Sequence, residues 1–372
     1  MTAFLDIATA PNAPTVSIQA RMRQERRRAA ATIAIAAALL VGGVLMGLGV
    51  GALPISPAEA ASILLAKLGL PALTPFEARD DLVMTAIRAP RTILGVLAGG
   101  ALAACGAALQ GLFRNPLADP TLIGVSSGAA LGAVTVIVLG GGVAAALPPV
   151  LAPSLLPLGA FCGGLIAIIA VYLIAQRDGG TDIATLLLAG VAITAISSAG
   201  IGLFIFISDD QQIRDINFWL LGSLSGANWR ALLPAAALII VGVCGILRQR
   251  RALDALSLGE ADAHHLGFDP ERVKRGLICC CALATGAAVA LTGVIGFVGL
   301  ITPHVVRLIA GPNHRMLLPT SILLGGALML AADVGARVVV APAELPIGIV
   351  TAAIGGPFFL WLLMRGRAFG GW

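Results

Sequence analysis

Long apolar runs separated by short polar breaks make up most of the chain, and this pattern predicts a bundle of membrane-spanning helices. The runs are continuous and do not alternate apolar with polar residues, so a closed β-barrel is disfavoured. We therefore expect an all-α polytopic membrane protein with about ten transmembrane helices. The expected spans are residues 29–53, 88–113, 121–139, 155–175, 183–207, 231–247, 273–295, 297–309, 316–340 and 347–364.

The first 28 residues are polar and end in the basic cluster RMRQERRR, directly before the apolar run 29–53. A cleavable signal peptide is the competing interpretation, but this run is longer than a typical signal core. We therefore expect residues 1–28 to form a cytoplasmic N-terminal tail and residues 29–372 to form one transmembrane domain. The stretch from Pro57 to Leu68 is predicted to be a short amphipathic helix outside the membrane.

Composition supports a membrane location. The chain has 372 residues, of which 58% are hydrophobic and 12% are charged, whereas soluble domains carry roughly 25% charged residues. The 46 glycines fit close helix packing, because small residues let backbones approach each other in lipid. The six cysteines lie in or near apolar runs, so helix packing is favoured over a disulfide framework.

The basic residues predict the orientation of the chain. Cytoplasmic loops of membrane proteins are enriched in Lys and Arg, and placing both termini in the cytoplasm puts seventeen of the 24 basic residues inside. The net charge of +5 is therefore interpreted as topology, and no nucleic-acid partner is expected. The basic residues left outside are Lys67, Arg79, Arg88, Arg91, Arg214, Arg230 and Arg337.

Several kinds of chemistry are missing from the sequence. Neither lysine, Lys67 or Lys274, follows a glycine, so no Walker A motif can be written and this chain is not expected to bind ATP in that way. No Cys/His spacing resembles a metal site, and no cofactor is expected. An enzyme is disfavoured because no convergent nucleophile and base can be identified.

Asp333 is the one candidate for an ionisable carboxylate inside a span. Arg337 lies one helical turn away, so a structural ion pair near the outer end of the span is favoured over a proton relay. An ion-coupled secondary transporter, whose uptake would depend on Asp333, stays open as an alternative.

A polar segment, residues 248–275, interrupts the apolar chain with eleven charged residues and two histidines. Gly259 and Gly267 each end a short stretch with apolar residues at helical spacing, which predicts two short helices with a bend. Asp269 and Pro270 then form the expected N-terminus of the next spanning helix.

This helix pair is suited to docking in a groove on another protein, because it carries Leu256, Leu258 and Leu266 between charged flanks. A solvated loop that lies on the lipid headgroups is the alternative.

Four long motifs resemble the iron-chelate, haem and vitamin B12 permease subunits of bacterial ABC importers. They are LGEADAHHLGFDPERVKR, RAPRTILGVLAGGALAACGAALQGLFRNPLADPTLIGVSSGAALGA, LTGVIGFVGLITPHVVRLIAG and AELPIGIVTAAIGGPFFLWLLMR. The resemblance implies a type II ABC importer permease fold in the bacterial inner membrane. It also implies a homodimer, two ABC ATPase subunits that bind ATP and Mg, and a periplasmic substrate-binding protein.

The resemblance also assigns roles to residues. Pro303-His304 is common in the family, and His304 is interpreted as structural or facing the cytoplasm. Docking of the binding protein falls on Arg88, Arg91 and Arg337, and an inner gate falls on Asn115, Pro116 and Leu117. Coupling to the ATPase falls on the polar segment 248–275, which we call the coupling segment, at Leu256, Leu258, Gly259, Glu260, Ala263, Leu266 and Gly267.

Haem is the favoured substrate, with a ferric siderophore or cobalamin as the alternatives. His264 and His265 stand where polar residues are more usual in the family, and exposed imidazoles there could briefly ligate haem iron as it leaves. Two solvated histidines without a role are the competing interpretation.

Overall fold

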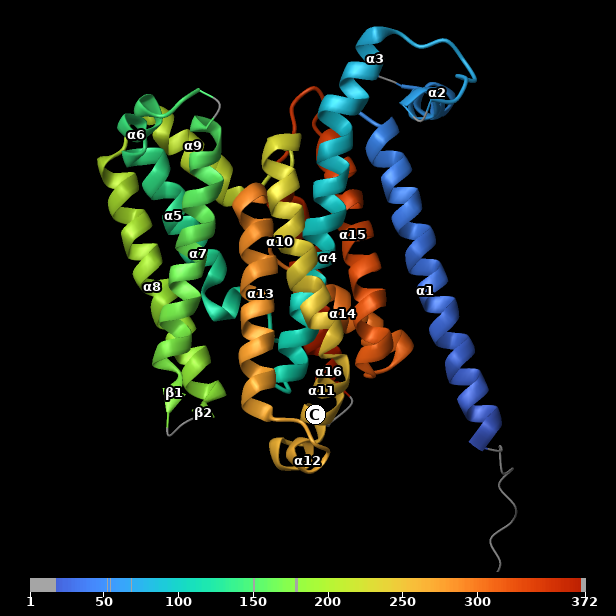
Figure 1. The fold of residues 1–372 in the computed structure, drawn as a ribbon, viewed down its shortest axis with the longest axis vertical. Coiled ribbons are helices and arrows are strands. Elements are labelled where there is room, and N and C mark those ends of the chain that lie inside the picture. The colour runs from blue at the N-terminus through green and yellow to red at the C-terminus, as the bar shows by residue number, and fades with distance from the viewer. Residues whose placement is uncertain are drawn as a thin grey trace, which may run out of the picture.

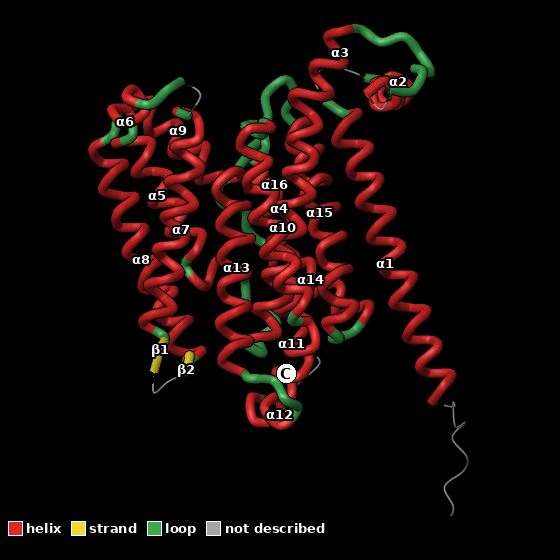
Figure 2. Tube along the Cα trace, viewed as in Figure 1, coloured by secondary structure: helices red, strands yellow, loops and turns green. Residues whose placement is uncertain are grey.

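The computed structural model describes residues 18–368, except residues 52, 54, 68, 150, 178 and 179. The described chain is a bundle of long helices (Figures 1 and 2) with one small hairpin, in which β1 (Gln176–Arg177) pairs antiparallel with β2 (Gly180–Thr181). The predicted all-α class is confirmed. Most of the expected N-terminal tail, residues 1–17, lies outside the described residues.

Seven of the described helices are long and apolar enough to cross a membrane, and three shorter apolar helices complete the expected ten. The ten are α1 (Ile18–Gly49), α4 (Ala89–Leu112), α5 (Val125–Leu139), α7 (Leu155–Ile174), α8 (Ile183–Ile207), α10 (Trp229–Arg248), α13 (Pro270–Thr292), α14 (Val298–Ala310), α15 (His314–Val338) and α16 (Ile347–Ala368). The connecting helices are α2 (Pro57–Lys67), α3 (Ala78–Leu82), the π-helical η1 (Val83–Arg88), η2 (Pro120–Ile123), α6 (Gly141–Ala146), η3 (Ala152–Ser154), α9 (Asp210–Leu221), α11 (Arg250–Leu258) and α12 (Glu260–His265).

Successive spans alternate in direction, so α1 begins and α16 ends at the same end of the bundle, where α11 and α12 also lie (Figure 1). We call this the inner end, following the orientation predicted from the basic residues. The outer end carries α2, α3, α6 and α9 (Figure 1). The two ends are therefore chemically different surfaces of one bundle.

Two spans begin earlier than the sequence pattern predicts. The first helix begins at Ile18 and not at residue 29, because the polar stretch before the apolar run is helical as well. The second begins at Ala78 and not at residue 88, since α3 and η1 lead directly into α4. The capping box of Glu77 and Asp80 starts α3, which gives the helix a defined N-terminus outside the apolar run.

A π-helical turn joins α3 to α4 and places a free carbonyl at the outer end. The backbone N–H of Ala89 bonds to the carbonyl of Met84, five residues back, and Pro90 has no N–H to donate. The carbonyl of Thr85 therefore lacks a helical donor, and the indole Nε1 of Trp229 donates to it at 2.9 Å. This bond ties α10 to the turn that carries Arg88.

Helix α4 lies at the centre of the bundle and packs closely on α14 and α15 through glycines. A Cβ added at Gly106 would lie 1.8 Å from the carbonyl oxygen of Gly299 in α14. A Cβ added at Gly99 would lie 2.3 Å from the carbonyl oxygen of Gly325 in α15. Both contacts are between backbones, so neither can be relieved by a side-chain rotation.

We predict that Gly106→Ala destabilises the protein strongly, because α4 and α14 must separate to admit the methyl group. Overpacking ordinarily costs about 1–3 kcal/mol, and a backbone contact lies at the upper end of that range or above it. Gly42→Ala in α1 is the matched control, since no heavy atom lies within 4 Å of its added Cβ. Thermal unfolding of the purified protein in detergent measures both; equal midpoints would contradict the close crossing.

Candidate functional sites at the two ends of the bundle

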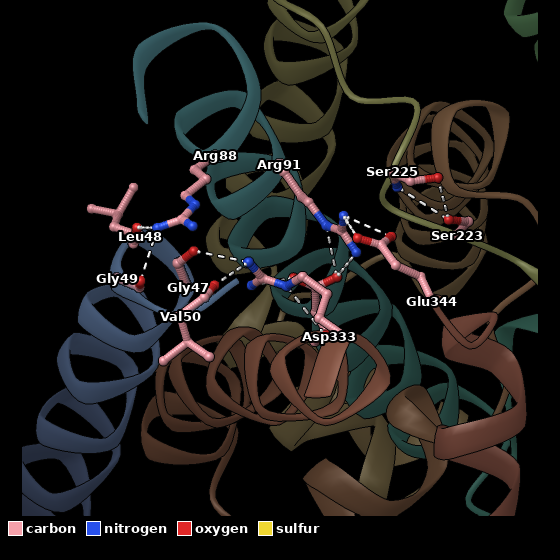
Figure 3. Close-up of polar contacts among 11 residues, drawn as sticks. Gly47, Leu48, Gly49, Val50, Arg88, Arg91, Ser223, Ser225, Asp333 and Glu344 are labelled. Atoms are coloured by element: carbon pink, nitrogen blue, oxygen red, sulfur yellow. Dashed lines mark hydrogen bonds and ion pairs between the residues drawn. The ribbon is translucent and has the colours of Figure 1, made fainter. Parts of the chain in front are cut away.

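Three arginines and two carboxylates form a cluster at the outer end, and Figure 3 labels Arg88, Arg91, Asp333 and Glu344 among them. Arg88, Arg91 and Arg337 are 4%, 7% and 8% exposed, so the folded chain covers them almost completely. The cluster, which we call the outer arginine cluster, consists of Arg88, Arg91, Arg337, Asp333 and Glu344.

Arg91 connects α4 to α15 and to the segment that follows α15. Its Nε and Nη2 lie 3.0 and 2.9 Å from Oδ1 of Asp333, whose side chain is 1% exposed. Its Nη1 donates to Oε1 and Oε2 of Glu344 at 3.0 and 2.9 Å, and the side chain of Glu344 is 42% exposed. One guanidinium therefore binds a buried carboxylate on one side and a half-exposed carboxylate on the other.

Arg88 and Arg337 hold the end of α1. Nη1 of Arg88 donates to two backbone carbonyls at 2.8 Å, and its Nη2 donates to a third. Nη1 of Arg337 donates to two more at 3.2 and 2.8 Å. Cationic groups at a helix C-terminus satisfy its free carbonyls and oppose its dipole, so these two arginines fix α1 on the bundle. The acceptors are the carbonyls of Gly47, Leu48, Gly49, Val50 and Leu53.

The predicted pair between Asp333 and Arg337 is present, with Oδ2 and Nη2 2.7 Å apart. The sequence analysis did not foresee that Asp333 also binds Arg91. Both of its oxygens are paired with arginines, which favours the structural ion pair over the proton relay that an ion-coupled carrier would need.

The docking role of the three arginines stays a prediction, and one premise of it needs correction. Arg88 in η1, Arg91 at the start of α4 and Arg337 in the last turn of α15 all lie at the outer end, as expected. They are not free surface arginines, however, because each is buried and bonded within the chain. The sequence could not show this, since the partners of Arg88 are backbone carbonyls 35 to 40 positions away.

Glu344 is the member of the cluster that the sequence analysis missed. A signal was present, because Glu344 is the only acidic residue of the chain after Asp333. It lies between the expected outer ends of residues 316–340 and 347–364, on the same side as the basic residues assigned to the outside. The basic residues assigned to the outside were the available partners.

The coupling segment forms two short helices at the inner end, as predicted. Helix α11 ends before Gly259, whose φ of 137° belongs to the region that glycine favours, and α12 ends before Gly267, whose φ is 87°. The carboxylate of Asp269 caps α13 by accepting from the backbone N–H groups of Glu271 and Arg272. The bend and the caps therefore orient the pair relative to α13.

The exposure of the apolar residues in this pair corrects part of the coupling prediction. Leu258 is 64% exposed and Leu266 is 59% exposed, so both are available to a partner. Leu256 and Ala263, at 4% and 0% exposed, instead pack against the body of the chain. Helical spacing alone cannot say which of two nearby apolar residues faces inward when two short helices meet at a bend.

Two polar contacts fix the helix pair to the spans. Nζ of Lys274, which is buried in α13, lies 2.8 Å from the carboxylate of Glu260 at the start of α12. Nζ also donates to the carbonyl of Thr181 in the hairpin between α7 and α8 at 3.1 Å. A displacement of α12 therefore acts on α13 and on that hairpin.

The second contact joins α11 to α15. The carboxylate of Asp254 accepts from the backbone N–H of His314 at 2.8 Å and lies 2.7 Å from its ring Nδ1. Burial opposes ionisation of Asp254, but the hydrogen bonds from His314 outweigh it and hold the pKa of this carboxyl below its usual value. Asp254 is therefore held in the form that accepts both bonds from His314.

The expected gate residues form an irregular turn at the inner end of α4. Arg114 has a φ of 47°, and Oδ1 of Asn115 accepts from the backbone N–H of Leu117 at 2.9 Å. A polar cleft of about 860 Å³ lies next to this turn and is lined by Arg114, Glu260 and Lys274 among others. The gate role of Asn115, Pro116 and Leu117 stays a prediction, but their turn lies beside the coupling contacts.

The histidines fall into two groups. His264 and His265 are exposed on α12, as the sequence analysis expects. His304 is 4% exposed and its ring lies edge-on to Phe358 at 6.4 Å between centroids, so it is structural and does not face solvent. The substrate contact of His264 and His265 stays a prediction.

Comparison with known proteins gives consistent matches. The sequence pattern of the FecCD transport family matches residues 38–365. The chain is 48% identical over 281 residues to the hemin transport system permease protein HmuU of Yersinia pestis, which covers 76% of this chain and 83% of that protein. It is 41% identical over 373 residues to the cobalamin import system permease protein BtuC of Halobacterium salinarum, covering 92% and 98%. A solved metal-chelate type ABC transporter in an inward-facing conformation superposes with a TM-score of 0.77 at 31% identity, covering 90% and 98%.

We predict that Asp333→Asn destabilises the protein by about 3–5 kcal/mol, because it leaves two buried guanidinium groups without their carboxylate. Thermal unfolding of the purified protein measures the loss. Glu344→Gln is the matched control: it also removes one carboxylate from Arg91, but a half-exposed one, so its effect should stay below about 1 kcal/mol. If the two variants unfold at the same temperature, Asp333 is not the centre of the cluster.

Proposed function

The chain belongs to the FecCD transport family, and from that premise we propose that it is the permease subunit of a binding-protein-dependent ABC importer that carries haem. The chain itself is a multi-pass permease of the ABC importer type. The exposed helix pair α11–α12 at the inner end carries the proposal, because it offers a contact for an ATPase that this sequence does not contain. The permease works in the inner membrane as a homodimer with both termini in the cytoplasm.

The 48% identity to a hemin permease supports haem as the substrate. The 41% identity to a cobalamin permease, over more of the chain, keeps cobalamin as the alternative, with a ferric siderophore as the third. All three are large metal chelates, so they require a wide path and a regulated gate. His264 and His265 are the residues that would briefly ligate the iron of a passing haem.

The mechanism is alternating access driven from the inner end. Two ATPase subunits bind the permease at Leu258 and Leu266. When the subunits close on ATP, they move α12. The contact between Glu260 and Lys274 transmits that movement to α13, and the carbonyl of Thr181 transmits it to the hairpin between α7 and α8. The turn at Asn115 borders the same cleft and opens to release the substrate inward.

The outer end receives the loaded substrate-binding protein at the outer arginine cluster. The burial of this cluster changes how the docking role must be tested. Reversing all three arginines to glutamate would also break the bonds that hold α1 and α15. Loss of activity in that variant would report lost folding as readily as lost docking. A diagnostic substitution must therefore leave Asp333 and the α1 contacts intact.

We predict that Leu258→Asp combined with Leu266→Asp lowers co-purification of the ATPase subunits by at least about tenfold, since two exposed apolar anchors are lost from the interface. Leu73→Asp is the matched control, because Leu73 is 69% exposed on the loop between α2 and α3 at the outer end. Pull-down of the tagged permease with its ATPase measures the effect. Undiminished co-purification of the double variant would remove the coupling assignment.

We also predict ATP-dependent uptake of haem by proteoliposomes that hold the permease, its ATPase and its binding protein, with a preference of about tenfold or more over cobalamin. The measurement is accumulated haem or cobalamin with ATP, without ATP, and with an ion gradient alone. Preferred uptake of cobalamin would reassign the substrate. Uptake driven by the gradient without ATP would instead indicate an ion-coupled carrier.

A further inference from the structure

Arg91 differs from the other two arginines because one of its partners is accessible from outside. Its Nε and Nη2 are committed to Asp333, which is 1% exposed. Its Nη1 is occupied by Glu344, whose side chain is 42% exposed. The inner edge of this guanidinium is therefore fixed, whereas a carboxylate arriving from outside can compete for Nη1.

The charges of the cluster favour such a competitor. Three guanidinium groups face two carboxylates, and the partners of Arg88 are neutral carbonyls. The cluster thus carries one excess positive charge with Glu344 in place and two when Glu344 leaves. A partly buried site with excess positive charge attracts an acidic side chain and holds it more strongly than an exposed site would.

Glu344 lies on an exposed connection, residues 339–346, between α15 and α16. The three valines that enter it, Val338, Val339 and Val340, are 54%, 73% and 45% exposed. They make the exposed start of this connection apolar, which suits a protein partner better than a free ion. The backbone N–H of Ile347, where α16 begins, donates to the carbonyl of Gly222 at 3.0 Å.

We propose that Glu344 is an internal occupant of Arg91: its carboxylate holds the position that an acidic side chain of the docked substrate-binding protein takes, and docking displaces it. This inference rests on the proposed function, in which the binding protein docks at the outer arginine cluster. It adds a residue that regulates docking and that the resemblance does not assign.

The exchange explains how buried arginines can serve as a docking site. One carboxylate replaces another on Nη1, so Arg91 is never left unpaired and its bonds to Asp333 are not disturbed. Contact with a weak or wrong partner does not displace Glu344, which makes the internal pair a threshold for docking. Release of Glu344 also removes the ion pair between Arg91 of α4 and the connection that leads into α16, so arrival of the binding protein reaches the start of a spanning helix.

The test measures the affinity of the cognate substrate-binding protein, in its substrate-free form, for the intact permease–ATPase complex in nanodiscs. Glu344→Gln should bind about tenfold more tightly than the wild type, because the competing charge is gone while Asp333 still positions Arg91. Glu344→Asp keeps the charge but withdraws it by one methylene, so its affinity should be intermediate. Asp210→Asn on α9 is the matched control: it removes one exposed outer carboxylate that has no bond to the cluster, and should change the affinity less than twofold.

The outcomes separate the inference from the function beneath it. Tighter binding by Glu344→Gln, with no change in Asp210→Asn, supports displacement. Unchanged or weaker binding by Glu344→Gln, while the wild type binds, overturns the internal occupant and leaves the docking site standing. Equal gains of affinity in Glu344→Gln and Asp210→Asn would mean that any lost negative charge strengthens binding, and would also overturn the internal occupant. A wild-type complex that binds no substrate-binding protein overturns the docking role and the inference with it.

Discussion

The carboxylate of Asp333 holds three helices together at the outer end of the bundle. It binds Arg91 of α4 and Arg337 of its own helix α15, and Arg337 reaches on to the last carbonyls of α1. In a site nearly closed to water, a single unpaired charge costs several kcal/mol. Each of these groups is therefore tolerated only because the others are in place, and the positions of α1, α4 and α15 are linked by charge as well as by packing.

The glycines of α4 and α15 make this charge pairing geometrically feasible. Gly99 and Gly325 bring the two antiparallel backbones into contact. Arg91 lies eight residues before Gly99, and Asp333 lies eight residues after Gly325. In antiparallel helices the same step of about 12 Å leads both chains to one level, so close contact at the glycines sets Arg91 opposite Asp333. A larger residue at either glycine would separate the helices and lengthen the ion pair.

The spans, the bend at Gly259 and the pair of Asp333 with Arg337 were predictable from the sequence, because each depends on neighbours a few residues apart. The burial of Arg88 was not predictable, since its acceptors are backbone carbonyls at the end of another helix. The inward side of Leu256 was not predictable either, because it depends on the angle at which α11 meets the bundle. Local pattern therefore located both candidate sites, and only the fold could say which side chains in them are free.

Helix α15 connects the two ends physically. Its first residue, His314, binds Asp254 of α11, and its last turns carry Asp333 and Arg337. A helix of 25 residues is about 37 Å long, enough to cross the roughly 30 Å hydrocarbon core of a bilayer. Because a helix resists bending far more than a loop does, a shift at either end must move the other or break one of these contacts. The same element that presents the carboxylate to Arg91 thus reaches the helix pair on which the ATPase is proposed to act. One continuous helix therefore lies between the outer arginine cluster and the coupling segment, with a polar contact at each end.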